Sequence, residues 1–257
     1  MLSGYGGENL LPSYEVEMKP ILVRRLQQAQ KHIHFFGQGA QIVITQPDLM
    51  VADSESGVEY RQKLADKINS YGSLHADHGI ELDSRFKSAV IFQDLDGAEE
   101  PKFDNRSYTP STWPGSRAPH VFLQDGRTST LDVYGPGYTL FDFTTSADNS
   151  TPSAGDIFGV VSQQLNIPVK IAKLRQEEHV RRIFGRSLVL IRQDGHVAWR
   201  SGKETPTEER VKEILQVVTG QTAFPGYNID SSVPDDSEVN DIAMGATGEL
   251  FGSKADI

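Results

Sequence analysis

The residues of this sequence that we consider as a general acid or base are His34, Arg117 and His120. An imidazole changes its charge between about pH 5 and 8, and a positioned group of this kind transfers protons efficiently. Arg117 lies between Gly115 and Pro119, two residues that shape a turn. A guanidinium at such a place ordinarily binds backbone carbonyls or a carboxylate. The sequence therefore favours an anchoring role for Arg117 over a catalytic one.

Ser116, His120 and Asp125 combine the residue types of a nucleophile, a base and an orienting acid. The members of a catalytic triad normally come from separate loops, whereas these three follow one another closely along the chain. The sequence also lacks the G-x-S-x-G turn that exposes a nucleophilic serine. We therefore do not expect a hydrolytic triad here.

Metal and thiol chemistry are also disfavoured. His32 and His34 form an H-x-H pair and His75 and His78 an H-x-x-H pair, but neither pair has further ligands at a spacing that repeats. Such histidines are usually surface or capping residues, so no metal site is expected. The chain has no cysteine, which excludes disulfides, thiolate zinc sites and cysteine nucleophiles.

Charge and hydropathy limit the partners of this protein. The chain has 257 residues and a formal net charge of −10, so it lacks the basic surface that nucleic acids and anionic membranes require. No apolar stretch is long enough for a membrane span, and the N-terminus does not resemble a signal peptide. We expect a cytoplasmic protein that binds neither nucleic acid nor membrane.

The first half of the chain carries two helical patterns. Apolar residues spaced three and four apart predict a helix over Leu10–Phe36 that ends at Gly37. Ser13 is the expected N-cap, with acidic residues in the first turn, and Pro20 is expected to kink or restart the helix. A second helix is expected over Val58–Tyr71, and the stretch between the two helices favours no element.

The second half predicts an α/β fold. Two short strands are expected on either side of an Asp-Gly turn, over residues 120–123 and 130–134. The elements expected after them are the strand Tyr138–Phe143, the helix Ser153–Leu165, the strand Val169–Leu174, the helix Glu177–Phe184, the hairpin strands Ser187–Arg192 and Val197–Arg200, and a helix from Thr205 to Gly220. A parallel strand pair joined by a helix, then a hairpin and a packing helix, indicates a mixed sheet flanked by helices, of the thioredoxin-like kind.

We therefore expect four segments. Residues 1–81 form a helical segment, residues 82–118 a connector over the surface, residues 119–225 the thioredoxin-like domain, and residues 226–257 an acidic, flexible tail with seven acids and one lysine. In a redox-active thioredoxin fold a dithiol precedes the first helix, but the loop Thr144–Ser153 holds no thiol. The domain is therefore expected to be redox-inert.

Two separate stretches resemble one family. The opening L-S-G-Y-G-G-E-N-L-L-P-S-Y-E-V-E-M-K-P, over Leu2–Pro20, is similar to the helix that closes the flavin domain of FAD-dependent aromatic hydroxylases of the phenol hydroxylase type. P-G-S-R-A-P-H-V-F-L-Q-D-G-R over Pro114–Arg127, continuing to Phe141, and L-V-L-I-R-Q-D-G-H-V-A-W-R over Leu188–Arg200 resemble the C-terminal thioredoxin-like domain of the same monooxygenases. The resemblance covers most of the chain up to Gly220.

This resemblance implies FAD and NADPH as cofactors and a phenolic or polyketide-derived aromatic ring as the substrate, as in secondary metabolism. The family's G-x-G-x-x-G turn and its later G-D motif, which hold the flavin, are missing from this chain. We therefore expect neither cofactor to bind the chain alone. Met18 and Lys19 stand where the family usually has arginines, so the contacts of those arginines are not expected.

Three hypotheses follow from the resemblance. In the first hypothesis, the chain is a C-terminal portion shortened by a deletion or by a gene model begun at an internal methionine, and it is inactive alone. In the second hypothesis it is a non-catalytic module that pairs with a flavin-bearing chain or dimerises. In the third it is a cofactor-free isomerase or cyclase of a phenolic intermediate, using Arg117, His120 or His34. The apolar faces of the two predicted helices are expected to pack on the flavin domain. In the isolated chain they would form an exposed apolar patch, so we expect a homodimer or aggregate.

Overall fold

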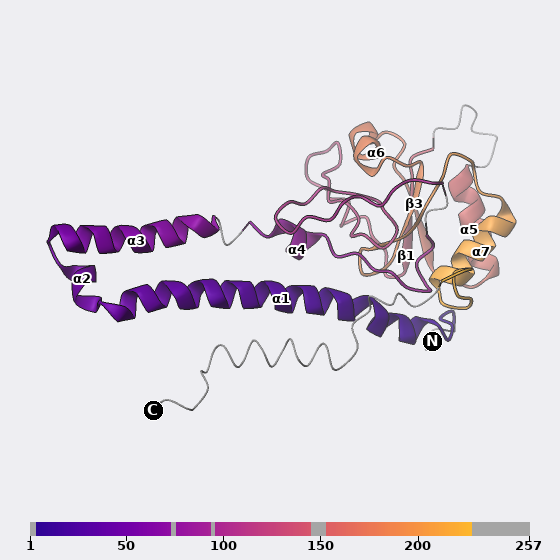
Figure 1. Cartoon of the computed structure of the whole chain (residues 1–257). Helices are drawn as coiled ribbons and strands as arrows, with labels where there is room; N and C mark the ends of the chain where they lie inside the picture. Colours follow the sequence, from indigo (N-terminus) through magenta and orange to yellow (C-terminus); the bar gives the residue numbers. More distant parts are fainter. Residues whose placement is uncertain (1–3, 73–75, 94–95, 145–152, 228–257) are drawn as a thin grey trace.

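A long helical arm projects from a small α/β domain in the computed structural model of this chain (Figure 1). The structure describes residues 4–72, 76–93, 96–144 and 153–227. The helical arm comprises α1 (Leu10–Thr45), α2 (Pro47–Val51) and α3 (Glu55–Tyr71), and α4 (His78–Leu82) follows it. The tail after residue 227 and most of the loop before Ser153 lie outside the described residues.

The helix α1 is longer than the sequence predicts. It begins after Asn9, so Ser13 is not its N-cap but a buried residue within the helix, where its hydroxyl donates to the Leu10 carbonyl at 2.8 Å. The helix continues without a restart through Pro20 and does not end at Gly37. An exposed glycine costs a helix only about 1 kcal/mol, which tertiary packing can offset.

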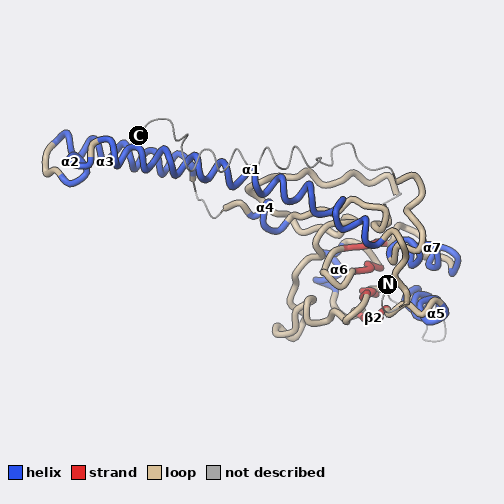
Figure 2. Tube along the Cα trace, turned by 90° about the horizontal axis from the view of Figure 1, so that it is seen from below, coloured by secondary structure: helices blue, strands red, loops and turns tan. Residues whose placement is uncertain are grey.

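Packing against α3 accounts for this extension. The two helices lie side by side along the arm, with α2 at its far tip (Figures 1 and 2). The Tyr60 hydroxyl of α3 donates to the Ile42 carbonyl of α1 at 2.6 Å. The predicted second helix is confirmed, and it begins at Glu55 because the Ser54 side chain accepts a hydrogen bond from the Gly57 amide.

A four-stranded mixed sheet forms the core of residues 111–224, which we call the sheet domain. Its strands lie in the order β2-β1-β3-β4, with β1 parallel to β2 and antiparallel to β3, and β3 antiparallel to β4. The elements are β1 (Tyr138–Asp142), α5 (Ala154–Gln164), β2 (Val169–Lys173), α6 (Glu178–Phe184), β3 (Leu188–Ile191), β4 (Val197–Arg200) and α7 (Glu208–Val218). The predicted α/β class and the order of these elements are confirmed.

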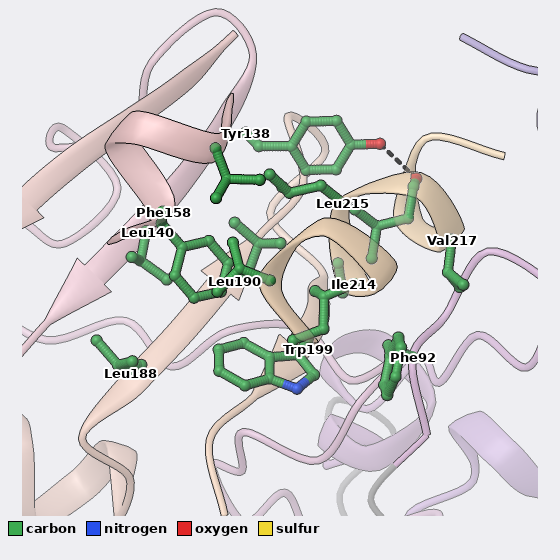
Figure 3. Packing of buried hydrophobic residues seen from close by; sticks show 14 of the residues in the cluster. Phe92, Tyr138, Leu140, Phe158, Leu188, Leu190, Trp199, Ile214, Leu215 and Val217 are labelled. Atoms are coloured by element: carbon green, nitrogen blue, oxygen red, sulfur yellow. Dashed lines mark hydrogen bonds between the residues drawn. The ribbon is translucent and has the colours of Figure 1, made fainter. Parts of the chain in front are cut away.

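Both faces of the sheet are covered by helices. Leu140 of β1 belongs to the cluster that includes Phe158 of α5 and Leu215 of α7, whereas the neighbouring Phe141 packs with Phe184 of α6 on the other face. Figure 3 shows the first cluster, where the Tyr138 hydroxyl donates to the Val218 carbonyl at 2.6 Å. The alternation along β1 is what a strand with two covered faces requires.

Two predicted strands before β1 were wrong. Neither residues 120–123 nor residues 130–134 form a strand, and of the two ranges only the first takes part in an isolated bridge, between Phe122 and Ser129. The Asp125 side chain accepts hydrogen bonds from the amides of Arg127 and Thr128, which makes a tight loop, and residues 130–134 follow a series of turns. Local side-chain hydrogen bonds of this kind compete with strand pairing.

The connector between the arm and the sheet was also mispredicted in part. It does not simply run over the surface, because residues 90–92 are almost fully buried and the Phe92 amide donates to the Ala198 carbonyl of β4 at 2.9 Å. Further along, the Gly115 amide donates to the Val197 carbonyl at 2.7 Å, so this stretch pairs with β4 as an additional edge. Short backbone pairings of this kind leave no periodicity in the sequence.

Gly115 is the tightest point of this edge. Its φ is +89°, and a Cβ atom built there would lie 1.9 Å from the Phe86 carbonyl oxygen. Gly126 has a similar φ of +66° but open space around it. We expect Gly115→Ala to lower the free energy of unfolding by about 1–3 kcal/mol more than Gly126→Ala, because both variants carry the backbone strain and only the first also clashes. Urea unfolding of both variants measures this, and equal losses would contradict it.

Candidate functional site

A buried charge network joins the arm to the sheet domain. Glu17 of α1 forms a two-pronged ion pair with Arg192, at the end of β3, with N–O distances of 2.8 and 3.1 Å. The Ser88 hydroxyl of the connector donates to the same carboxylate at 2.6 Å, and Arg192 also binds Asp194 at 2.6 Å. Only 4% of Glu17 is exposed. We call these four residues, with Ser84 and His196 described below, the junction network.

Neighbouring groups in the junction network keep Arg192 and Asp194 ionised. Burial acts to lower the pKa of Arg192, but the hydrogen bond and charge of Glu17 outweigh it and raise that pKa. Burial likewise acts to raise the pKa of Asp194, yet His196, whose backbone amide donates to the carboxylate at 3.1 Å, and the charge of Arg192 outweigh it and hold the pKa at about 2. These groups therefore remain ionised at neutral pH.

His196 gives the junction network the residue types of a serine–histidine–aspartate triad. Its ring stacks on Phe86 with centroids 4.0 Å apart, and its Nε2 lies 3.1 Å from the Ser84 Oγ. The Nδ1 atom is 3.5 Å from the Asp194 carboxylate and makes no hydrogen bond there. A catalytic triad needs that second hydrogen bond to orient the imidazole. The geometry supports an anchoring role for this histidine.

The three acid–base candidates from the sequence do not converge. His34 is exposed on α1 and pairs with Gln38 on the same helix at 2.7 Å. His120 is exposed and lies edge-on to Phe122, with centroids 5.0 Å apart. Arg117 is half-buried, and the described residues offer its side chain no ion pair. It contributes to the connector edge through its backbone bridge with His196.

Arg117 lies near two partly buried phenols. Its positive charge opposes the rise in pKa that burial causes at Tyr108 and Tyr134, where the pKa of Tyr134 still reaches about 12. The other residues considered for a nucleophilic triad are separate: Ser116 is buried, and Asp125 binds the backbone of its own turn. None of these candidates belongs to the group of Ser84, His196 and Asp194, which the sequence analysis did not single out.

A second polar cluster holds the arm beside the connector. The carboxylate of Asp77, 4% exposed, accepts from the Gln28 amide at 2.6 Å and lies 2.9 Å from the His32 Nε2. Tyr71 packs edge-on to His32, with centroids 5.6 Å apart. His32, one member of the H-x-H pair, is thus a partner of a buried acid. Within the described ranges, no group of three or more histidines and acids could hold a metal ion.

Comparison with known proteins identifies the family of the sheet domain. The family model described as "Aromatic-ring hydroxylase, C-terminal" matches residues 111–222, which is nearly the whole sheet domain. Residues 111–222 are the C-terminal domain of the aromatic-ring hydroxylases. The matched region contains β1 to β4, Arg192 and His196, whereas the helical arm precedes it.

Relatives of this hydroxylase portion extend across the arm as well. The FAD-dependent monooxygenase opdD of Penicillium oxalicum is 32% identical over 86% of this chain and 41% of its own length. Aklavinone 12-hydroxylase RdmE of Streptomyces purpurascens is 30% identical over 86% of this chain and 36% of its own length. A 2,4-dichlorophenol 6-monooxygenase of Cupriavidus pinatubonensis is 28% identical over 78% of this chain and 37% of its own length. The chain therefore spans about two fifths of the relatives it matches.

Solved structures agree with this assignment. The native and K252c-bound RebC-10x structure superimposes with a TM-score of 0.67 at 26% identity, covering 85% of this chain and 39% of that protein. The flavin-dependent monooxygenase PieE in complex with FAD and substrate superimposes with a TM-score of 0.61. No helix in the described part of the hydroxylase portion is long and apolar enough to cross a membrane.

The ion pair of Glu17 with Arg192 provides a stability test. Glu17→Gln removes the buried carboxylate and leaves the Arg192 guanidinium paired with Asp194 alone, so we expect it to lower the free energy of unfolding by about 1–3 kcal/mol. Glu15→Gln on the same helix removes only an exposed pair with Lys19 and should cost less than about 1 kcal/mol. Chemical denaturation measures both variants. Similar small losses would show that the buried pair does not hold the arm.

Asp194 provides a test with acid. Its pKa is about 2 in the folded chain, below the usual value of 3.8, so its stabilising contribution is present above about pH 4 and lost as the pH falls toward 2. Asp194→Asn should therefore flatten the decline of stability between about pH 4 and 2. Glu59→Gln, at an exposed position on α3, is the control. Unfolding followed at several pH values measures this, and unchanged acid sensitivity in Asp194→Asn would contradict it.

Proposed function

We propose that this chain is the C-terminal part of an FAD-dependent monooxygenase that hydroxylates phenolic or polyketide-derived aromatic rings, with NADPH as the reductant. The names of its relatives support the reaction, since they include a dichlorophenol monooxygenase and an aklavinone hydroxylase. We further propose that the flavin is held by polypeptide outside these residues. The observation that carries this proposal is the family match to residues 111–222.

The described residues do not fit the pyrophosphate of FAD. Dinucleotide sites place the phosphates at a helix N-terminus that follows a strand. Here the first turn of α5 carries Asp156, whose pKa is lowered to about 2 by Lys173 and Ser153, and α6 begins with Glu178, whose pKa is lowered by Arg181. Each of these helix ends already carries an ionised acid that repels phosphate. This supports an FAD pyrophosphate site outside the described residues.

The helical arm supplies the surface for that flavin-bearing polypeptide. Most large apolar side chains that are exposed among the described residues lie on the arm: Leu11, Tyr14, Leu22, Phe36, Val43, Ile44, Val51, Val58 and Ile68. An exposed apolar surface of this extent is typical of an interaction site. Because the relatives continue for about three fifths of their length beyond the matched region, we propose that the arm packs on that remainder.

The other hypotheses from the sequence have less support. A homodimer through the same arm is the alternative occupant, and the experiment below separates the two. A cofactor-free isomerase or cyclase would need Arg117, His120 or His34 to act on one ligand, but His34 and His120 are engaged with their own neighbours in sequence. We infer that the sheet domain is thioredoxin-like in strand order, and without cysteines it has no dithiol chemistry to offer.

Gel filtration with absorbance detection tests the proposal. We expect the chain alone to retain no FAD, and to elute together with the flavin-bearing part of the Penicillium oxalicum relative expressed without its own matched region. NADPH-dependent hydroxylation by that mixture would follow. Ile44→Asp combined with Val51→Asp should abolish co-elution, whereas Phe122→Asp, at an exposed apolar residue of the sheet domain, should not.

Two outcomes would overturn the proposal. Stoichiometric FAD on the chain alone would place the flavin site within these residues. A stable homodimer that resists the flavin-bearing part, and that Ile44→Asp with Val51→Asp dissolves, would make the arm a dimer interface instead.

A further inference from the structure

One face of α1 is apolar and exposed along the whole helix. Its large exposed side chains follow one another at close to whole numbers of helical turns, which keeps them on one face. They are Leu11, Tyr14, Leu22, Phe36 and Val43, and we call them the α1 stripe. Buried residues of α1 repeat in the same way on a different face, which packs on the connector and α3: Ser13, Glu17, Ile21, Gln28 and Phe35. The α1 stripe is therefore a second contact face of this helix.

The surroundings of the α1 stripe favour an acidic partner. Residues 18–45 include no aspartate or glutamate. Arg25 lies one turn after Leu22 on the same face, is exposed, and has no ion pair among the described residues. Lys19 is compensated by Glu15 at 2.6 Å, so its charge adds little. An apolar face that contains an uncompensated guanidinium is complementary to a segment with both apolar and acidic side chains.

The end of the same chain has this composition. Residues 226–257, which we call the tail, carry seven acids and one lysine. Large apolar residues are distributed among these acids: Ile229, Val233, Val239, Ile242, Met244, Leu250 and Phe251. The tail therefore offers both the apolar side chains and the negative charge that the α1 stripe would bind.

The tail also begins at the right place. Tyr227, the last described residue, packs on the same hydrophobic cluster as Tyr5, and the Gly7 amide donates to the Thr219 carbonyl at 2.8 Å. The start of α1 lies beside α7 in Figures 1 and 2. The 36 residues of α1 span about 54 Å, whereas residues 228–257 can reach about 100 Å when extended. Tethering gives the tail a high effective concentration along the whole stripe.

We propose that the tail binds along the α1 stripe of its own chain, with apolar side chains on Leu22 and Phe36 and acidic ones near Arg25. This contact does not depend on where the flavin is held. The α1 stripe is also part of the surface that we assign to the flavin-bearing polypeptide, so the tail would compete with that polypeptide. The competition, unlike the contact, rests on the proposed function.

Single-molecule energy transfer within the full chain tests the contact. The chain has no cysteine, so Ser237→Cys in the tail and Gln27→Cys at an exposed position of α1 provide two labelling sites. We expect a major population with high transfer efficiency, which represents the bound tail. A chain without this population would overturn the proposal. Transfer between separately labelled chains that rises with concentration would overturn it in favour of a contact between two copies.

Matched variants locate the contact on the stripe. Arg25→Glu should lower the ratio of bound to free tail by about threefold to tenfold, because it replaces an attraction with a repulsion. Lys31→Glu makes the same charge change at an exposed position on another side of α1 and should have little effect. Equal effects of these two variants would contradict a contact at the stripe.

A second pair of variants tests the apolar part of the contact. Leu22→Asp with Phe36→Asp should release the tail, because these substitutions put charges in the middle of the stripe. Val160→Asp with Ile183→Asp, at exposed apolar residues of the sheet domain, should leave it bound. A tail that stays bound in the first variant lies elsewhere on the molecule, and the proposal is then wrong.

The competition has a separate test. Asp235→Asn, Asp236→Asn and Glu238→Gln together should strengthen binding of the flavin-bearing part of the Penicillium oxalicum relative by about threefold to tenfold, because a weakened tail leaves the stripe more often. Unchanged affinity would refute the competition. A flavin-bearing part that does not bind at all would refute the proposed function, whereas the energy transfer within the chain would still decide the contact.

Discussion

The buried ion pair between Glu17 and Arg192 is the contact on which the arrangement of this protein depends. It joins the first helix to the end of β3, and the Glu17 carboxylate outweighs the burial that acts to lower the pKa of Arg192. Ser88 adds a hydrogen bond from the connector, so three distant parts of the chain meet at one carboxylate. Removing charges from water is costly, and only a complete set of partners repays that cost.

The sheet domain and the helical arm differ in how fully their apolar surfaces are covered. The sheet domain covers both faces of its sheet, with Leu140 and Phe141 pointing to separate clusters. The helical arm packs α1 on α3 but leaves much apolar surface in water. Burial of apolar area is the main favourable contribution to folding and association, so such a surface is explained most simply by further polypeptide packed on it. In our proposal, that polypeptide corresponds to the part of the relatives that lies outside the matched region.

The segments that carry the family resemblance make specific contacts in this structure. The stretch that begins at Pro114 contains Gly115, whose backbone approaches Phe86 too closely for any side chain, and whose amide pairs with β4. The opening stretch contains Glu17, and the stretch Leu188–Arg200 contains its partner Arg192. The similar segments are therefore the ones that dock the connector and the arm on the sheet.

The sequence by itself determined the α/β class, the order of the elements from β1 to α7, and the family, because alternating apolar residues, the Ser153 cap and the Asp194-Gly195 turn are local signals. It did not determine where α1 ends, since contacts with α3 outweigh the local preference of Gly37. The tertiary structure alone decided the pairing of Glu17 with Arg192, of His32 with Asp77, and of Ser84 with His196. These partners are far apart along the chain, and hydrogen bonds and ion pairs between distant residues leave no periodicity that a single sequence reveals.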